Sequence, residues 1–310
     1  MKVAVLYGGV SNEREVSLSS GKGIMEALKQ KGHEVIGIDF HPERLNEIIN
    51  LDVDLVFIGL HGKFGEDGRI QGLLDMLEIP YVGSGVLASA LAMDKTKAKQ
   101  IFKLKNIPIP KGKTFSINRN TDSQKIVDTI NNHFQLPFVI KPNREGSTLG
   151  LTIVTERSQI DNAIKIAGDS DERILVEEFI KGKELTVAVL GATGKEKALP
   201  IIEIIPKNEY YDYESKYAQG GSEHIIPARI SEVLTKEIQG YAVDAHQALN
   251  CEVYSRVDFI LDEHNVPYIL EVNTLPGMTP TSLFPDTAKV TGLNYNEMIE
   301  EFLTLSVNEK

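Results

Sequence analysis

The 310-residue sequence is short of the features that mark secreted and membrane proteins. It contains a single cysteine, Cys251, so no disulfide can form within the chain. Cys251 precedes Val253 and Tyr254, and it is expected to be a small buried residue rather than a nucleophile. No run reaches the roughly eighteen apolar residues of a membrane helix, and the N-terminus enters a strand pattern without a cleavable signal. A cytoplasmic protein without a membrane partner is therefore predicted.

Positive charge is also scarce. The chain has 33 basic and 44 acidic residues, a net charge of −11, so it would repel a nucleic-acid backbone overall, and no nucleic-acid partner is expected. An anionic ligand must therefore be held by a few placed lysines, arginines and backbone amides. The sequence lacks a Walker GxxxxGK[ST] loop, internal repeats and low-complexity segments. It also lacks the GxGxxG order, which disfavours a dinucleotide oxidoreductase.

The N-terminal part alternates apolar runs with amphipathic segments, which is typical of a parallel sheet covered by helices. The length of the whole chain and its 42% hydrophobic residues allow two or three domains. A capping box of Asn12 and Glu15 predicts a helix to about residue 31, and Pro108 and Pro110 mark a candidate boundary. Strands are predicted over 3–7, 34–39 and 55–60, and further helices over 70–78 and 86–104.

From residue 136 onward the pattern changes to short β-branched runs broken by glycine. A polar, aromatic segment over 207–223 is too irregular for either period, and loops of that length are usually functional or disordered. An amphipathic helix over 231–250 follows. Strands are predicted over 137–141, 151–154, 174–178 and 185–190, and a hairpin over 254–261 and 268–272.

That hairpin carries carboxylates inside otherwise apolar strands. Glu271 and Asn273 share one face because side chains alternate along a strand, and antiparallel pairing can bring Asp258 beside them. Two carboxylates and an amide oxygen suit Mg²⁺. The alternative is a structural ion pair, for which Arg256 is the obvious partner.

Three further features have two interpretations each. The loop over 141–150, rich in glycine, hydroxyl and basic residues, suits phosphate binding or is an ordinary turn. Lys95 and Lys141 could face ATP phosphates or be solvated surface groups. His61 and residues 66–68 lie at the carboxyl end of the third predicted strand, where ligands bind in open α/β sheets. His61 is either a ligand contact or a structural hydrogen-bonding group.

Taken together, several motifs resemble the D-alanine:D-alanine ligases of the ATP-grasp superfamily. The resemblance covers essentially the whole chain in order, and the first and last motifs are specific to that family. It implies an α/β, overall α+β, fold with a Rossmann-like parallel-sheet domain over 1–94, a central domain over 95–179 and a C-terminal domain over 180–310. The motifs are NEREVSL at 12–18, LHG at 60–62 with GEDG at 65–68, MDK at 93–95, REGS at 144–147, RVD at 256–258 and EVNTLPGMT at 271–279.

The resemblance also implies the cofactors. ATP would lie between the central and C-terminal domains, with two Mg²⁺ ions, for which Mn²⁺ is an alternative, on Asp258, Glu271 and Asn273. A monovalent cation is a further candidate. The nucleotide residues would be Lys95, Lys141, Ser147 and Thr148 on the phosphates, Glu177, Glu178, Phe179 and Ile180 on adenine, and Glu184 on the ribose. Lys216 would also bind the nucleotide.

The implied reaction joins two D-alanines through an acyl phosphate to D-alanyl-D-alanine, a peptidoglycan precursor, in a homodimer. Catalysis would involve Glu13, Ser147, Tyr217, Arg256 and Gly277. His61 would contact substrate, Glu13 the first ammonium, and Ser282 and Leu283 the second carboxylate. The segment over 207–223 would be a lid. Tyr217 favours the dipeptide over D-alanyl-D-lactate. D-serine, D-lactate or another amino acid is an alternative acceptor, and a nucleotide-binding regulator without activity is an alternative from another class.

Overall fold

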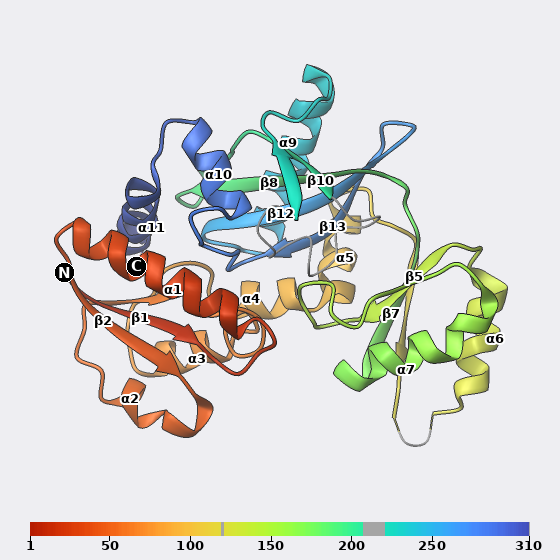
Figure 1. Ribbon diagram of the computed structural model, residues 1–310, viewed down its shortest axis with the longest axis horizontal. Coiled ribbons are helices and arrows are strands. Elements are labelled where there is room, and N and C mark those ends of the chain that lie inside the picture. The colour runs from red at the N-terminus through yellow and green to blue at the C-terminus, as the bar shows by residue number, and fades with distance from the viewer. Residues whose placement is uncertain (119–120, 207–220, 310) are drawn as a thin grey trace.

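The computed structural model describes residues 1–118, 121–206 and 221–309, which form three sheets with helices packed around them (Figure 1). A parallel sheet comes first in the chain, and two antiparallel sheets follow. The predicted mixture of a parallel α/β part with strand-rich parts is therefore confirmed. Among the described residues, no helix is long and apolar enough to cross a membrane.

The N-terminal sheet has the order β2-β1-β3, and both pairings are parallel. Its strands are the three predicted from the apolar runs. Every residue of β3 is buried, as expected where helices cover both faces of a parallel sheet. The elements are β1 (Lys2–Gly8), α1 (Arg14–Gln30), β2 (Glu34–Phe40), η1 (Pro42–Arg44), α2 (Asn46–Ile49), β3 (Leu55–Ile58) and α3 (Arg69–Met76).

Two helix predictions in this part need correction. The capping box of Asn12 is wrong, because α1 begins at Arg14 and its N-cap residue, Glu13, makes no side-chain cap. The single helix over 86–104 is also wrong. Asp94 is extended, with φ −82° and ψ 93°, and its side chain accepts a hydrogen bond from the backbone N–H of Lys97, so it ends α4 (Val86–Met93) and caps α5 (Lys95–Leu104).

The central sheet is antiparallel with the order β4-β7-β5-β6. Three of its strands match predicted runs, whereas β4 and both helices were not predicted. Buried residues of α6 and α7 join those of β5 and β7 in one core. The elements are β4 (Gly112–Ser116), α6 (Ser123–His133), β5 (Phe138–Pro142), β6 (Thr152–Val154), η2 (Arg157–Gln159), α7 (Ile160–Ser170) and β7 (Arg173–Glu178).

The C-terminal sheet has the order β11-β10-β8-β12-β13, with β9 also paired to β8. The predicted hairpin is present as β12 and β13, and the predicted long helix as α9. Residues 222 and 223, placed in an irregular segment by the sequence, lie in β11; the rest of that segment over 207–220 is outside the described residues. The elements are β8 (Gly182–Gly191), β9 (Lys197–Ala198), β10 (Ile202–Pro206), β11 (Ser222–Ile225), α9 (Glu232–Ala248), β12 (Val253–Asp262), β13 (Pro267–Asn273), α10 (Leu283–Val290) and α11 (Tyr295–Glu309).

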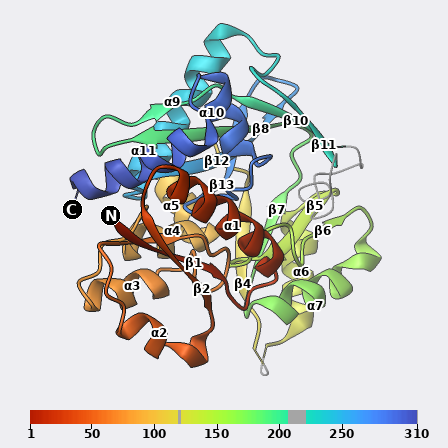
Figure 2. The same cartoon turned by 60° about the vertical axis from the view of Figure 1, so that its left-hand side comes forward.

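The last helix returns to the first sheet, and the two chain ends lie close together in both ribbon views (Figures 1 and 2). Tyr254 of β12 stacks on Phe302 of α11 with ring centroids 4.2 Å apart, and both belong to the core of the N-terminal sheet. Cys251 is buried, as predicted, and burial raises the pKa of its thiol to about 12. In both views α6 and α7 lie on the opposite side of the molecule from α2 and α3, so the three parts meet in the middle.

Candidate functional site

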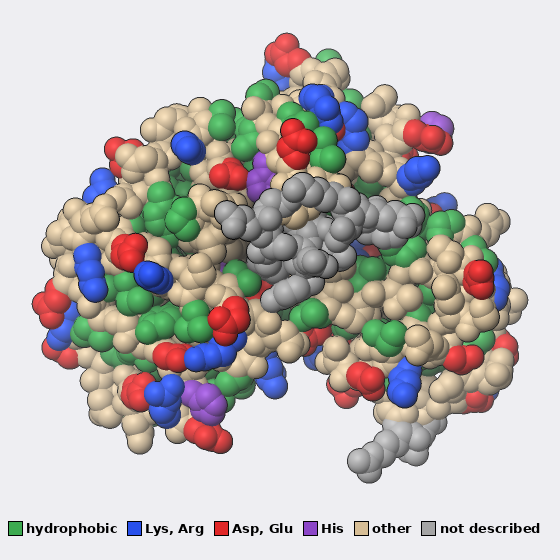
Figure 3. All heavy atoms as spheres, in the orientation of Figure 1, with side chains coloured by type: hydrophobic (Ala, Val, Ile, Leu, Met, Phe, Trp, Pro, Cys, Tyr) green, Lys and Arg blue, Asp and Glu red, His purple; other side chains and the backbone are tan. Residues whose placement is uncertain are grey.

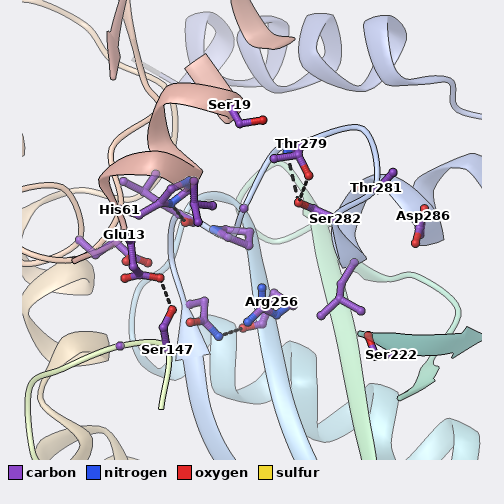
Figure 4. A pocket seen from close by; sticks show the side chains of 18 of the residues that line it. Glu13, Ser19, His61, Ser147, Ser222, Arg256, Thr279, Thr281, Ser282 and Asp286 are labelled. Atoms are coloured by element: carbon purple, nitrogen blue, oxygen red, sulfur yellow. Dashed lines mark hydrogen bonds between the residues drawn. The ribbon is translucent and has the colours of Figure 1, made fainter. Parts of the chain in front are cut away.

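A polar cavity of about 650 Å³ lies where the three parts meet. In the close view, Glu13, His61 and Ser147 are on one side, Ser222, Ser282 and Asp286 are on the other, and Arg256 is between them (Figure 4). Its lining residues come from the start of α1, the loop after β5, the hairpin β12–β13 and the start of α10. They include most of the predicted catalytic and substrate residues, which are Glu13, His61, Ser147, Arg256, Gly277, Ser282 and Leu283, and two of the predicted metal ligands, Glu271 and Asn273.

Glu13 and Ser147 connect the N-terminal and central parts. The Ser147 hydroxyl donates a hydrogen bond to Glu13 Oε1, and both side chains are buried. Ser147 and Thr148 have φ values of 52° and 65°, in the left-handed region that non-glycine residues rarely occupy. A Cβ added to Gly146 would lie 3.0 Å from Glu13 Oε2. Strained backbone of this kind is concentrated at ligand sites.

His61 lies in the cavity wall with both ring nitrogens hydrogen-bonded. Nδ1 is 3.0 Å from the Leu275 carbonyl oxygen, which can only accept, so Nδ1 carries the proton. Nε2 is 3.1 Å from the Ser20 hydroxyl, which also accepts from the Met278 N–H. Burial lowers the pKa of His61, in agreement with a neutral ring. Of the two predicted roles, structural hydrogen bonding is present.

The hairpin places its oxygen-bearing side chains as the strand alternation predicted. Asp258 is paired with Glu271, and Arg256 with Asn273, in the antiparallel register. The alternative interpretation, a structural ion pair, is present, since Arg256 Nη2 lies 2.9 Å from Asp258 Oδ2. Asp258 further accepts hydrogen bonds from Thr186 at 2.6 Å and Asn273 at 3.0 Å.

Lys95 links this hairpin to the central part. Its ammonium group lies 3.1 Å from Glu271 Oε2 and donates to the Glu145 carbonyl oxygen at 2.7 Å. Lys95 is the first residue of α5, and the Lys95 backbone N–H donates to the Asn143 carbonyl oxygen. A positive charge is thereby fixed between the loop after β5 and the hairpin.

A second cavity, of about 180 Å³, opens between the two antiparallel sheets. Gly146 and Glu271 line both cavities, so the two adjoin there. It collects nearly all the described residues that were predicted for the nucleotide; Ser147 lines the polar cavity instead, and Lys216 and Tyr217 lie outside the described residues. Those lining the second cavity are Lys95, Lys141, Thr148, Glu177, Glu178, Phe179, Ile180 and Glu184, together with Asp258 and Glu271.

Two buried lysines share one buried carboxylate beside this cavity. Glu177 lies 2.7 Å from Lys141 Nζ and 2.8 Å from Lys99 Nζ. Burial raises the pKa of Glu177, but the two lysines more than offset this and lower it. Burial lowers the pKa of Lys99 to about 8. When both lysines are protonated, the trio has a net positive charge.

The far end of the polar cavity is formed by the start of α10. Ser282 is the N-cap residue of α10, and its hydroxyl accepts from the Thr279 N–H at 3.1 Å. A Cβ added to Gly277 would lie 3.2 Å from the Ser282 hydroxyl oxygen, so only a residue without a side chain fits easily. A helix N-terminus with a hydroxyl beside it favours an anion.

Comparison with known proteins identifies the family. The model for the D-ala D-ala ligase C-terminus matches residues 101–304, and the model for the N-terminus matches 2–46 and 41–84. The chain belongs to the D-ala D-ala ligase family. A D-alanine–D-alanine ligase of Halalkalibacterium halodurans is 58% identical over 311 residues and covers 100% of both chains. One of Carboxydothermus hydrogenoformans is 47% identical and covers 99% of this chain and 98% of the relative.

Solved structures of D-Ala ligases share the ATP-grasp fold of this family member. The VanG D-Ala:D-Ser ligase from Enterococcus faecalis has a TM-score of 0.84 and 34% identity, and covers 98% of this chain and 99% of its own. The D-alanine–D-alanine ligase from Bacillus anthracis complexed with ATP has a TM-score of 0.82 and 30% identity, and covers 99% and 97%.

The structure of this D-Ala ligase also brings in residues that the sequence did not single out as site residues. Lys99 could have been found, because it follows Lys95 by one helical turn and so lies on the same face of α5. Glu66 lies in the polar cavity, and burial together with nearby Glu13 raises its pKa to about 8. His224 and Asp286 meet only through the tertiary fold, and no local signal marks them.

Proposed function

We propose that this family member joins two D-alanines to D-alanyl-D-alanine, using ATP and releasing ADP and phosphate, for peptidoglycan precursor synthesis. The junction of the two cavities at Gly146 and Glu271 is the observation that carries the proposal. A phosphoryl group at the end of a nucleotide in the second cavity would face a carboxylate bound in the polar one. Phosphoryl transfer depends mainly on such positioning and on charge stabilisation.

The nucleotide would occupy the second cavity. Lys95, Lys141 and the backbone around Ser147 and Thr148 would hold its phosphates, where the net positive charge of the lysine trio supports an anion. The segment over 178–180 would face adenine, and Glu184 the ribose. The Glu177 carboxylate is taken by Lys99 and Lys141, so its proposed part in nucleotide binding is to hold those lysines.

Asp258, Glu271 and Asn273 fit a magnesium site by the chemistry of their donors. No three acidic, histidine or cysteine side chains gather as a metal site in the described ranges, and the candidate set contains one amide oxygen instead. Two carboxylates and an amide next to a phosphate site suit Mg²⁺, or Mn²⁺ as the alternative. Two bound ions would offset the charge of the transferring phosphoryl group. Lys95 and Arg256 offset the carboxylates here. A monovalent cation stays a further proposal.

The amino acids would occupy the polar cavity. Glu13, held by Ser147, would bind the ammonium of the first D-alanine. Arg256 and the Gly277 amide would stabilise the negative charge that develops when the second amine attacks the acyl phosphate. His61 would contribute van der Waals contact, because its two nitrogens are taken by Leu275 and Ser20.

The second D-alanine would bind at the other end of the cavity. Its carboxylate would lie at Ser282 and Leu283, where the N-terminus of α10 adds a favourable dipole. This places its amine towards Arg256 and the first amino acid. Enclosure from water is needed here, because water would hydrolyse the acyl phosphate.

Domain boundaries, assembly and location complete the proposal. We place the three functional units at 1–94, 95–179 and 180–310, in a cytoplasmic homodimer. No nucleic-acid partner is proposed. On the face drawn in Figure 3, acidic and basic side chains are interspersed, and the net charge of the chain is −11.

The test is D-alanine-dependent ATP hydrolysis by the purified chain with Mg²⁺, combined with identification of the product. We expect ADP, phosphate and D-alanyl-D-alanine in equal amounts. Competing D-serine and D-lactate would reveal another acceptor preference, which the similarity to a D-Ala:D-Ser ligase makes worth testing. ATP binding without phosphate release would favour the regulator alternative.

A further inference from the structure

A hydrogen-bonded network of three polar side chains borders the end of the polar cavity that would bind the second amino acid. Ser222 and His224 project from β11, and Asp286 from the first turn of α10. All three line the cavity, and Figure 4 shows Ser222 and Asp286 on the same side as Ser282. None of them was assigned a role by the sequence motifs.

The contacts define the order of the three side chains in this network. His224 Nδ1 lies 2.6 Å from Asp286 Oδ2, and a carboxylate can only accept, so Nδ1 carries a proton. His224 Nε2 lies 3.2 Å from the Ser222 hydroxyl oxygen. The His224 and Asp286 side chains are 20% and 31% exposed, which protects their interaction from much of the solvent screening that weakens surface pairs.

This contact ties an edge strand to a helix. β11 lies at the edge of its sheet and pairs with β10 from Glu203↔Ile225 to Pro206↔Ser222. A second contact between this region and α10 is a small apolar cluster in which Leu283 packs with Ile202 and Ile204 of β10 and with Ile226, which follows β11. The position of the first turn of α10, including Ser282 and Leu283, therefore depends on how β10 and β11 are held.

Charge gives the contact a second effect. Asp286 lies four residues after Ser282 in the same helical turn, so its carboxylate would repel an acceptor carboxylate bound at the helix N-terminus. A hydrogen bond from His224 offsets that negative charge. Without it, the helix N-terminus would attract an anion less strongly.

The geometry points to Ser222, His224 and Asp286 as positioning residues for the second amino acid: their contacts fix the start of α10, and the hydrogen bond from His224 offsets the negative charge of Asp286 near its N-terminus. This inference rests on the proposed function. It assigns the three residues to the second D-alanine and not to ATP or the first D-alanine, because this network borders the end of the cavity opposite Glu13 and Ser147.

The experiment measures the initial rate against D-alanine concentration at saturating ATP and fits a separate KM for each D-alanine. For His224→Leu, which loses the contact and leaves the Asp286 charge without its donor, we expect the second KM to rise about tenfold, as for the loss of one charge-assisted hydrogen bond. Asp286→Ala loses the contact but also the repelling charge, so its second KM should rise less, by about threefold. The first KM and the KM for ATP should stay within about twofold. Ser222→Ala should give a smaller rise of about threefold, and Asp286→Asn, which keeps an acceptor for His224, should recover most of the loss.

His33→Leu is the matched control. His33 Nε2 lies 2.9 Å from Glu300 Oε2, with side chains 10% and 33% exposed, but neither residue lines the polar or the nucleotide cavity. Its second KM should equal that of the wild type. If His224→Leu does not fold, Ser222→Ala and the Asp286 pair of variants decide the question.

An unchanged second KM in the folded variants, or an equal rise in all three KM values, would overturn the inference. The proposed function is tested separately by the wild type. A wild type that makes no dipeptide contradicts that function, whereas a wild type that makes it and variants that match it contradict only the positioning role.

Discussion

The two cavities balance their charges in different ways. Beside the nucleotide cavity, Lys99 and Lys141 share Glu177, so basic groups outnumber acidic ones in a buried trio. Around the polar cavity the acidic lining residues Glu13, Glu15, Glu271 and Asp286 outnumber Arg256. The first arrangement suits phosphates, and the second suits ammonium groups and metal ions. One junction between sheets can therefore bind phosphates on one side and ammonium groups on the other, because the ion pair of Lys95 and Glu271 lies between the two cavities.

Glu177→Gln would break the balance of the nucleotide cavity and is expected to have the largest effect. It leaves two buried lysines without a counter-charge, which costs about 3 to 5 kcal/mol when one partner of a buried ion pair is removed. Denaturant unfolding of the ligand-free protein would measure the loss. Glu232→Gln is the control, because its pair with Lys236 is exposed and worth at most about 1 kcal/mol. Equal stability of both variants would show that the trio is not a stabilising unit.

Arg256→Ala would break the balance of the polar cavity. We expect turnover to fall by roughly 10²-fold or more, because a donor to the developing negative charge is lost. Steady-state kinetics would measure it. Arg229→Ala is a matched control, since Arg229 pairs with Glu203 of β10, in the same sheet as Arg256, but lines neither cavity. Turnover like that of the wild type would remove Arg256 from the mechanism.

The strands and the oxygen-bearing side chains of the hairpin could be predicted from the sequence. Strand alternation placed Asp258, Glu271 and Asn273 on one face, and the register of β12 and β13 agrees. The apolar runs gave the N-terminal strands and most strands of the two later sheets. Residues in regular strands are predictable because period-2 alternation and burial act locally.

The rest depends on contacts between distant segments. The break at Asp94 was missed because the helical composition of 86–104 continues through it. The new helix is recognised only from the structure, in which the Asp94 side chain caps it by accepting a hydrogen bond from the Lys97 N–H. The link between Glu13 and Ser147 spans 134 positions, and that between His224 and Asp286 spans 62. No local pattern specifies such pairs. The family resemblance supplied Glu13 and Ser147, but not Lys99 or His224.

Glu271→Gln tests the border between the cavities. Because one charge of the proposed metal site disappears, we expect a rate at least about tenfold lower at ordinary Mg²⁺, partly restored by excess Mg²⁺. The rate as a function of Mg²⁺ concentration would measure this. Glu263→Gln in the exposed turn of the same hairpin is the control and should behave as the wild type. A rate near that of the wild type at every Mg²⁺ concentration would count against the metal role of Glu271.

Glu66→Gln is expected to have the smallest effect of these substitutions. Burial and the charge of Glu13 raise the Glu66 pKa from an ordinary value of 4.5 to about 8, so at neutral pH the folded protein holds a proton that the unfolded chain releases. Wild-type stability should therefore fall, relative to Glu66→Gln, as pH rises from about 4.5 to about 8. The glutamine variant mimics the protonated acid and should lack this dependence. Unfolding midpoints at several pH values would measure the difference, and parallel curves would mean that Glu66 is already ionised in the polar cavity.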